Sequence, residues 1–202
     1  RTRPFDGSMS TLPAPSDSPS ARTRPLVFVI VGAVIAVLLA TLTMGAVFAP
    51  VGALAAPYRP TSADGYLREP VALDDSSPAI RRLDPELRAA LHQAADAAAT
   101  TGVSIRITSG WRAPRLQQWL LDQAVKSYGS EETALEWVAT PDRSHHVTGA
   151  AVDVGPVGAQ AWLSRHGAQW GLCQVYGNEA WHFELLTTPG GPCPPPRANA
   201  AD

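Results

Sequence analysis

The sequence has little net charge and few cysteines, and both shortages exclude classes of function. Its 202 residues include 16 lysines and arginines against 18 aspartates and glutamates, so the formal net charge is −2. A nucleic-acid-binding surface needs a basic excess, so we expect no nucleic-acid partner. The only cysteines are Cys173 and Cys193, and neither belongs to a CxxC pair. A four-cysteine zinc site is therefore excluded.

Charge is also absent from one long apolar run, residues 26–48. As a helix this run would be about 34 Å long, which is enough to cross a bilayer core. Arg22 and Arg24 precede it, and the first basic residue after it is Arg59. This asymmetry predicts a cytoplasmic N-terminal side and a single-pass membrane protein with an extracytoplasmic domain. The small residues around Ala55 also fit a signal-peptidase site, and cleavage there would secrete the domain.

Prolines are scarce in the middle of the chain. Ten of the 19 prolines lie before residue 81 and five lie after residue 188, which leaves four between. A compact domain tolerates few internal prolines because each removes an amide donor and fixes φ. We therefore expect a folded domain at 81–188. Around it we expect a disordered cytoplasmic tail (1–25), a membrane anchor or signal segment (26–48), an extended linker (49–80) and a Pro-rich tail (189–202).

An exported location permits a disulfide, so we expect Cys173 and Cys193 to join and to hold the Pro-rich tail on the domain. Within the domain, periodicity and capping residues predict the secondary structure. Helices are expected from Pro85 to a stop at Gly102, over 114–128, after a Ser130 cap and near 157–169. Strands are expected at 103–108, 150–154, 172–176 and 181–186, and a polar loop at 141–149. This order predicts an α+β domain with a small antiparallel sheet and helices packed mainly on one side.

Two polar segments contain the residue types that zinc accepts. Residues 144–153 read SHHVTGAAVD and include His146 and Asp153, and residues 179–182 read EAWH and include His182. Two histidines and one aspartate would leave a fourth position for water, which is typical of a catalytic zinc site. Glu179 could face that water as a base without being a ligand. We expect His145, next to a ligand, to be an ordinary loop residue.

With a third segment, these two resemble the D-alanyl-D-alanine carboxypeptidase and dipeptidase family of zinc peptidases, which includes vancomycin-resistance enzymes. The family pattern S-x-H-x-x-G-x-A-x-D is matched at 144–153 and E-x-W-H at 179–182. The pattern S-G-[YW]-R with a later glutamine is matched at 109–117, where the sequence reads SGWRAPRLQ.

The resemblance implies a Zn²⁺ enzyme that acts on the D-Ala-D-Ala end of a peptidoglycan stem peptide. It implies that Arg112 binds a substrate carboxylate or stabilises the oxyanion, for which a permanently charged guanidinium is suited. Ser144 and Gln117 would help to bind the substrate, although Gln117 could equally orient Arg112.

Other functions remain open at this point. A peptidoglycan endopeptidase or a D,D-dipeptidase would use the same residues, because the sequence does not reveal how the pocket closes around the substrate. From a different class, a non-catalytic cell-wall binding module could keep the metal, and a membrane-anchored assembly factor could use the domain for docking. A base at Glu179 and a cation at Arg112 favour an enzyme, since a purely structural metal site has no use for a base.

Overall fold

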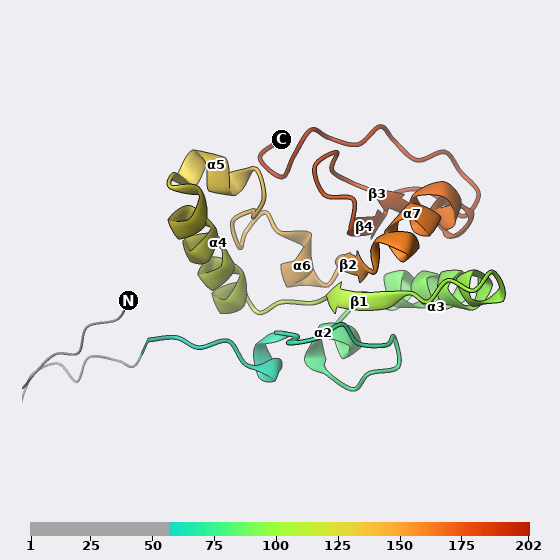
Figure 1. Cartoon of the computed structure of the whole chain (residues 1–202), viewed down its shortest axis with the longest axis horizontal. Coiled ribbons are helices and arrows are strands. Elements are labelled where there is room, and N and C mark those ends of the chain that lie inside the picture. The colour runs from blue at the N-terminus through green and yellow to red at the C-terminus, as the bar shows by residue number, and fades with distance from the viewer. Residues whose placement is uncertain (1–56) are drawn as a thin grey trace, which may run out of the picture. The chain divides into compact units, whose positions relative to one another are not determined.

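A computed structural model describes residues 57–202 of the chain (Figure 1). The predicted cytoplasmic tail, the predicted membrane segment and the first part of the predicted linker lie outside the described residues. Within residues 57–202, no helix has the length and apolar character needed to cross a membrane.

A four-stranded antiparallel sheet lies at the centre of the domain, in the order β1-β2-β4-β3. This arrangement confirms the prediction of an α+β domain with a small antiparallel sheet. Three of the strands are shorter than predicted, β2 has the predicted length but is shifted by one residue, and β1 begins three residues later than expected. Their bounds are β1 (Arg106–Ser109), β2 (Ala151–Gly155), β3 (Leu172–Gln174) and β4 (His182–Leu185).

The helices begin largely where capping residues predict. Asp84 accepts hydrogen bonds from the backbone N–H groups of Glu86 and Leu87, which starts α3. The predicted polar loop at 141–149 instead contains one helical turn, α6, too short to produce a periodic pattern. The elements are η1 (Ser62–Asp64), α2 (Pro78–Arg81), α3 (Pro85–Thr100), α4 (Pro114–Tyr128), α5 (Glu131–Leu135), α6 (His145–Thr148), α7 (Val157–His166) and η2 (Gly167–Trp170).

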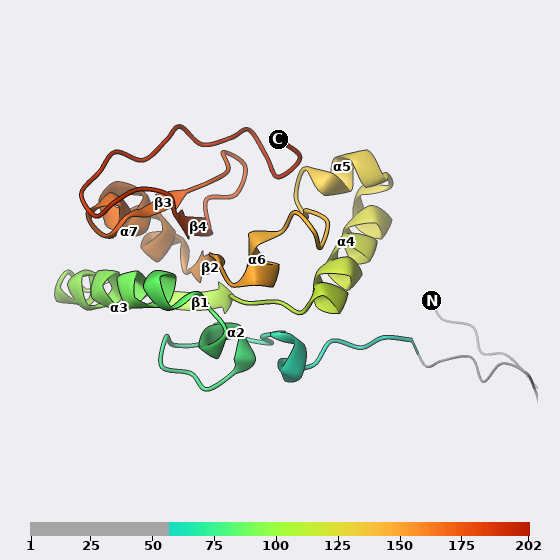
Figure 2. The same ribbon diagram turned by 180° about the vertical axis from the view of Figure 1, so that it is seen from behind.

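The two faces of the sheet have different chemistry. Side chains alternate between faces along a strand, so Val152, Val154 and their neighbour Phe183 share one face. These residues form the core with apolar side chains of α2, α3 and α7. Asp153 and His182 therefore lie on the opposite face. Helices α4 and α5 form a second small cluster at the other end of the domain from α3 and α7 (Figure 2).

The part of the predicted linker that the structure describes, 57–80, is packed on the domain and not extended. The backbone of Val71 exchanges two hydrogen bonds with Ile107 of β1, with N···O distances of 2.9 and 2.8 Å. Asp64 of η1 is buried, 1% exposed, and is paired with Arg115 of α4. The folded domain therefore includes residues 57–80 and not only the sequence from α3 onward.

The predicted disulfide is confirmed: Cys173 of β3 is bonded to Cys193. It joins the tail to the edge strand of the sheet across a sequence separation of 20 residues. The disulfide therefore holds the Pro-rich tail against the domain at its fifth residue.

We predict that Asp64→Asn destabilises the fold in a pH-dependent way. Burial alone raises the pKa of Asp64, but hydrogen bonds from Thr61 and Arg115 outweigh it and hold the pKa below its usual value. The carboxylate therefore stabilises the fold at neutral pH, and this contribution disappears as the pH falls below about 4. The free energy of unfolding of the variant should be about 2 kcal/mol lower than that of wild type at pH 7.

Urea unfolding of chelator-treated protein between pH 3 and 7 would measure this effect, with Asp96→Asn on the exposed face of α3 as the control. The difference between wild type and Asp64→Asn should shrink as the pH falls. A difference that stays constant over this range would contradict the assignment.

Candidate metal centre

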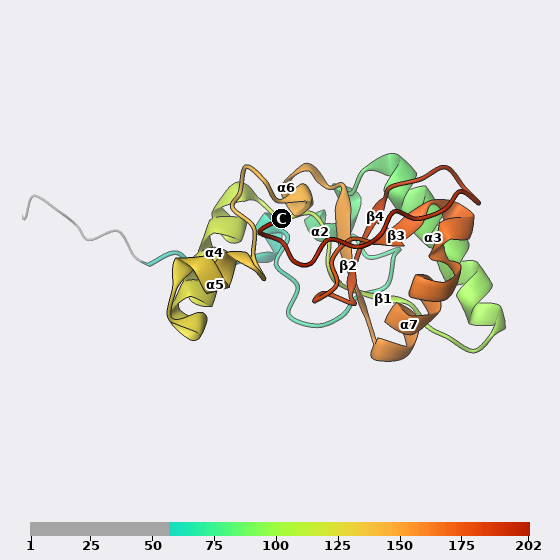
Figure 3. The ribbon, with the colours of Figure 1, turned by 90° about the horizontal axis from the view of Figure 1, so that it is seen from above.

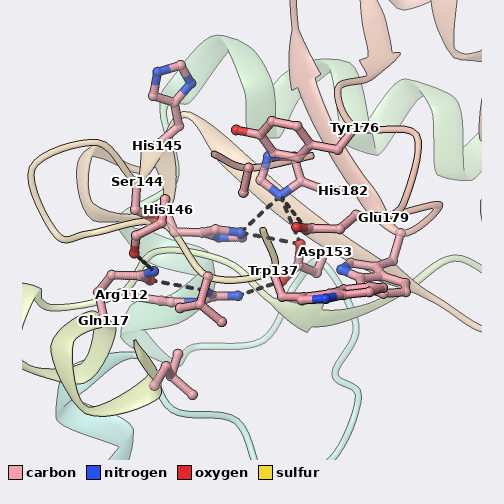
Figure 4. A pocket seen from close by; sticks show the side chains of 15 residues that line it. Arg112, Gln117, Trp137, Ser144, His145, His146, Asp153, Tyr176, Glu179 and His182 are labelled. Atoms are coloured by element: carbon pink, nitrogen blue, oxygen red, sulfur yellow. Dashed lines mark hydrogen bonds and ion pairs between the residues drawn. The ribbon is translucent and has the colours of Figure 1, made fainter. Parts of the chain in front are cut away.

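Three side chains that are far apart in the sequence converge on one point of the polar face (Figure 4). Asp153 of β2 lies directly opposite His182 of β4 in the sheet register, so both project from the same face. His146 comes from α6, just before β2. The Asp153 Oδ1 atom lies 3.3 Å from His146 Nε2 and 3.2 Å from His182 Nδ1, and the two nitrogens are 3.3 Å apart. All three residues are buried.

This triangle of donor atoms fits a tetrahedral zinc ion. Zinc–nitrogen and zinc–oxygen bonds near 2.05 Å in a tetrahedron place neighbouring ligand atoms about 3.3 Å apart. The observed sides of 3.2 and 3.3 Å match that separation. Two imidazoles and one carboxylate are also the donor types of catalytic zinc sites, although other divalent ions accept them.

Two motif glycines allow the backbone to hold His146 in place. Gly149 ends α6 with φ = +83°, and a Cβ atom there would lie 2.3 Å from the carbonyl oxygen of Arg82. Gly110 follows β1, and a Cβ atom there would lie 2.2 Å from the carbonyl oxygen of Ala79. Its own carbonyl lies 2.8 Å from His146 Nδ1. Side chains at either position would push the metal-facing loop out of place.

The hydrogen bond to Gly110 also selects the correct form of His146. A proton on Nδ1 donates to the carbonyl and leaves Nε2 unprotonated, as a metal ligand requires. Burial and the nearby positive charge of Arg112 lower the pKa of His146 to about 4. The imidazole is therefore neutral at physiological pH.

His182 is oriented by Glu184, a residue outside the three sequence motifs. The Glu184 carboxylate accepts from Nε2 of His182 at 2.9 Å and also contacts Nδ1 of His145 at 2.7 Å. His145 is therefore part of the network around the site and not an ordinary loop residue. Glu184 lies two residues after His182 on the same strand, so alternation along β4 could have identified it.

The charge around His182 favours a cation at this position. Burial alone would lower its pKa, but hydrogen bonds to Asp153 and Glu184 outweigh burial and raise the pKa to about 9. A metal ion at Nδ1 would displace a proton, so metal binding and protonation compete here.

Glu179 is a buried carboxylate beside the metal centre and is not one of its three donors. It is 5% exposed, and its Oε2 atom lies 3.9 Å from His182 Nδ1. Its Oε1 atom has no hydrogen-bond partner among the described residues. Burial raises the pKa of Glu179 to about 7. A carboxylate with a free oxygen and a pKa near neutrality is suited to accept and release a proton.

Arg112 is held in the pocket by three side-chain partners. Its Nε donates to Ser109 at 2.7 Å, Nη1 to Gln117 at 3.0 Å and Nη2 to Asp153 at 2.6 Å. A guanidinium has five N–H groups, so two remain for another oxygen anion. Arg112 therefore supports a metal-site carboxylate and can still bind a ligand.

The two other predicted substrate-binding residues also line the pocket. The amide of Gln117 is occupied on both sides, because its oxygen accepts from Arg112 and its nitrogen donates to Ala139 at 2.8 Å. These bonds favour the orienting role for Gln117. Ser144 starts α6 but its hydroxyl caps no backbone N–H of that helix.

The pocket encloses about 180 Å³ and has a polar and an aromatic side. Ser144 and Gln117 lie on one side of the metal centre, and Trp137 lies on the other (Figure 4). Trp137 stacks on Trp181 with ring centroids 6.5 Å apart, and Tyr176 packs against His182. Trp181 is the tryptophan of the E-x-W-H pattern, whereas Trp137 and Tyr176 belong to no motif and were not predicted from the sequence.

Comparison with known proteins connects this geometry to one family. Residues 80–188 match the family model described as VanY, D-alanyl-D-alanine carboxypeptidase. A D-alanyl-D-alanine carboxypeptidase of Enterococcus faecalis (strain ATCC 700802 / V583) is 30% identical over 130 residues, covering 52% of this chain and 48% of that protein. This chain thus spans about half the length of that relative.

A solved structure has a similar fold. It is a mutant of the vancomycin-resistance D,D-pentapeptidase VanY, from a VanB-type resistance cassette, in complex with Zn(II). The TM-score is 0.50 and the sequence identity 26%, with 59% of this chain and 79% of that chain covered.

We predict that Glu184→Ala weakens metal binding. Without the carboxylate, the ring of His182 loses the bond that fixes its orientation, and zinc affinity should fall by about 10- to 100-fold. Competition with a chromophoric chelator would measure the affinity. Glu132→Ala, which removes an exposed carboxylate from α5, is the matched control. Equal zinc affinities for the Glu184 variant and wild type would exclude this role.

Proposed function

This chain belongs to the VanY family of D-alanyl-D-alanine carboxypeptidases, and on that basis we propose that it is a zinc-dependent carboxypeptidase acting on D-Ala-D-Ala ends of peptidoglycan stem peptides. One observation carries the proposal: three donor atoms spaced as zinc requires lie beside a buried carboxylate with a free oxygen. A structural metal site has no need of that carboxylate.

His146, Asp153 and His182 would hold the zinc ion. When bound, zinc would act as a Lewis acid, which lowers the pKa of water towards ~7 and polarises a carbonyl group. The solved relative bound Zn(II), which supports zinc as the metal here.

Glu179 would move the proton during peptide-bond hydrolysis. Its Oε1 atom is free to accept a proton from the attacking water and to pass it to the nitrogen of the departing D-alanine. The raised pKa, about 7, suits both halves of this transfer.

Arg112 would bind the negatively charged oxygen of the substrate. Its two uncommitted N–H groups can contact either the terminal carboxylate or the oxygen that becomes negative during attack. Gln117 and Ser109 would keep the guanidinium in position, and the hydroxyl of Ser144 is available to the same end of the substrate. The rest of the peptide would then extend towards the aromatic side of the pocket.

We also infer that the domain works outside the cytoplasmic membrane, attached through residues 26–48 or released by cleavage near Ala55. The Cys173–Cys193 disulfide supports this location, because such bonds persist in oxidising compartments. Protease treatment of intact cells should degrade the domain, and full protection would contradict an external location.

Glu179→Gln is the direct test of the reaction. The amide keeps the size of the side chain but cannot accept the proton, so kcat/KM should fall by about 10²- to 10⁴-fold. Zinc content should stay at the wild-type level. Glu132→Gln should retain full activity. A Glu179→Gln variant as active as wild type would contradict the role of base.

Product analysis by mass spectrometry would separate the related activities. Release of one D-alanine from a pentapeptide that ends in D-Ala-D-Ala supports the proposal. Cleavage of a tetrapeptide ending in a single D-alanine would indicate an L,D-carboxypeptidase. An internal cut would indicate an endopeptidase, and hydrolysis of free D-Ala-D-Ala a dipeptidase. Binding without any product would indicate a cell-wall binding module.

A further inference from the structure

The C-terminal segment, residues 193–202, crosses the domain from the edge strand of the sheet towards α5 (Figures 1 and 3). It starts at the disulfide on β3. It then runs beside the β3–β4 connection, where Arg197 pairs with Tyr176 in a parallel bridge. The N–H of Arg197 donates to Val175 at 2.9 Å and its carbonyl accepts from Gly177 at 2.7 Å.

The other end of the C-terminal segment is attached to the opposite side of the pocket. The N–H of Ala200 donates to the carbonyl of Glu136, which follows α5, at 3.2 Å. The side chain of Arg143 donates to the carbonyl of Ala201 at 3.1 Å. The segment therefore connects the β3–β4 connection with the chain between α5 and α6. Attachment at both ends makes it a fixed part of the pocket.

Ala200 is the residue of the C-terminal segment that reaches the pocket. It is only 7% exposed and lines the same cavity as the metal ligands, Trp137 and Trp181. Its backbone is bonded to the residue before Trp137, which places it on the aromatic side. Other residues of the segment, including Ala198, are exposed. A larger side chain at position 200 would occupy space that a ligand needs.

We propose that the C-terminal segment is a wall of the substrate pocket and that Ala200 is a specificity-determining residue. It limits the size of the substrate residues on the amino side of the cleaved bond. This inference rests on the proposed function, in which Arg112 and Ser144 bind the terminal carboxylate. The terminal D-alanine, which leaves after cleavage, then fills the polar side of the pocket. The substrate residues on the amino side of the cleaved bond must lie against Trp137, Trp181 and Ala200.

The test compares two substrates in four proteins. N-acetyl-Gly-D-Ala-D-Ala and N-acetyl-Trp-D-Ala-D-Ala have the same cleaved bond and differ in the bulk that precedes it. Ala200→Leu should raise the preference for the glycine peptide roughly tenfold, mainly through KM of the tryptophan peptide. Ala200→Gly should lower this preference. Ala198→Leu, on the exposed side of the same segment, should leave it unchanged.

Trypsin cleavage after Arg197 reports whether the segment stays attached. If trypsin cleaves Ala200→Leu faster than wild type, the larger side chain has displaced the segment. The substrate preference of Ala200→Gly then decides alone whether Ala200 limits the size of the substrate. Equal preferences in wild type, Ala200→Leu and Ala200→Gly, with the segment protected, would overturn the role of Ala200 and leave the proposed function intact. A wild-type protein that neither cleaves nor binds either peptide would overturn the proposed function and this inference together.

Discussion

The register between β2 and β4 is the constraint on which the site depends. Asp153 and His182 are direct neighbours in the sheet, so both point away from the core and towards each other. If either strand slipped by one residue, its side chains would move to the other face of the sheet, and Asp153 and His182 would no longer meet. The buried residues Val152, Val154 and Phe183 oppose such a shift, because they would then leave the core. Hydrophobic packing on one face thus fixes the donor atoms on the other.

Asp153 also connects the metal centre to the substrate side of the pocket. One carboxylate oxygen lies between the two imidazoles, and the other accepts from Arg112. Arg112 is in turn fixed by Ser109 and Gln117. A displacement of Asp153 would therefore disturb both metal binding and the orientation of the guanidinium. Asp153 thus connects residues from three separated motifs within one pocket.

Much of this arrangement could be predicted from local sequence signals. The Asp84-Pro85 cap, the helix over 114–128 and the three motifs each depend on neighbouring residues, and the structure brings the predicted ligands and Glu179 together. Residues 57–80 could not be assigned correctly from proline content, because prolines suit helix starts as well as linkers, and Pro78 begins α2. The path of the C-terminal segment depends largely on backbone hydrogen bonds, which leave no side-chain pattern in the sequence.

The central claim is that His146, Asp153 and His182 together bind one zinc ion. X-ray absorption at the zinc edge of the zinc-loaded protein measures this most directly. We predict one zinc per chain, with two imidazole nitrogens and oxygen donors at about 2.0–2.1 Å and no sulfur among the ligands. Substoichiometric zinc, or fewer than two imidazoles among the ligands, would contradict this claim.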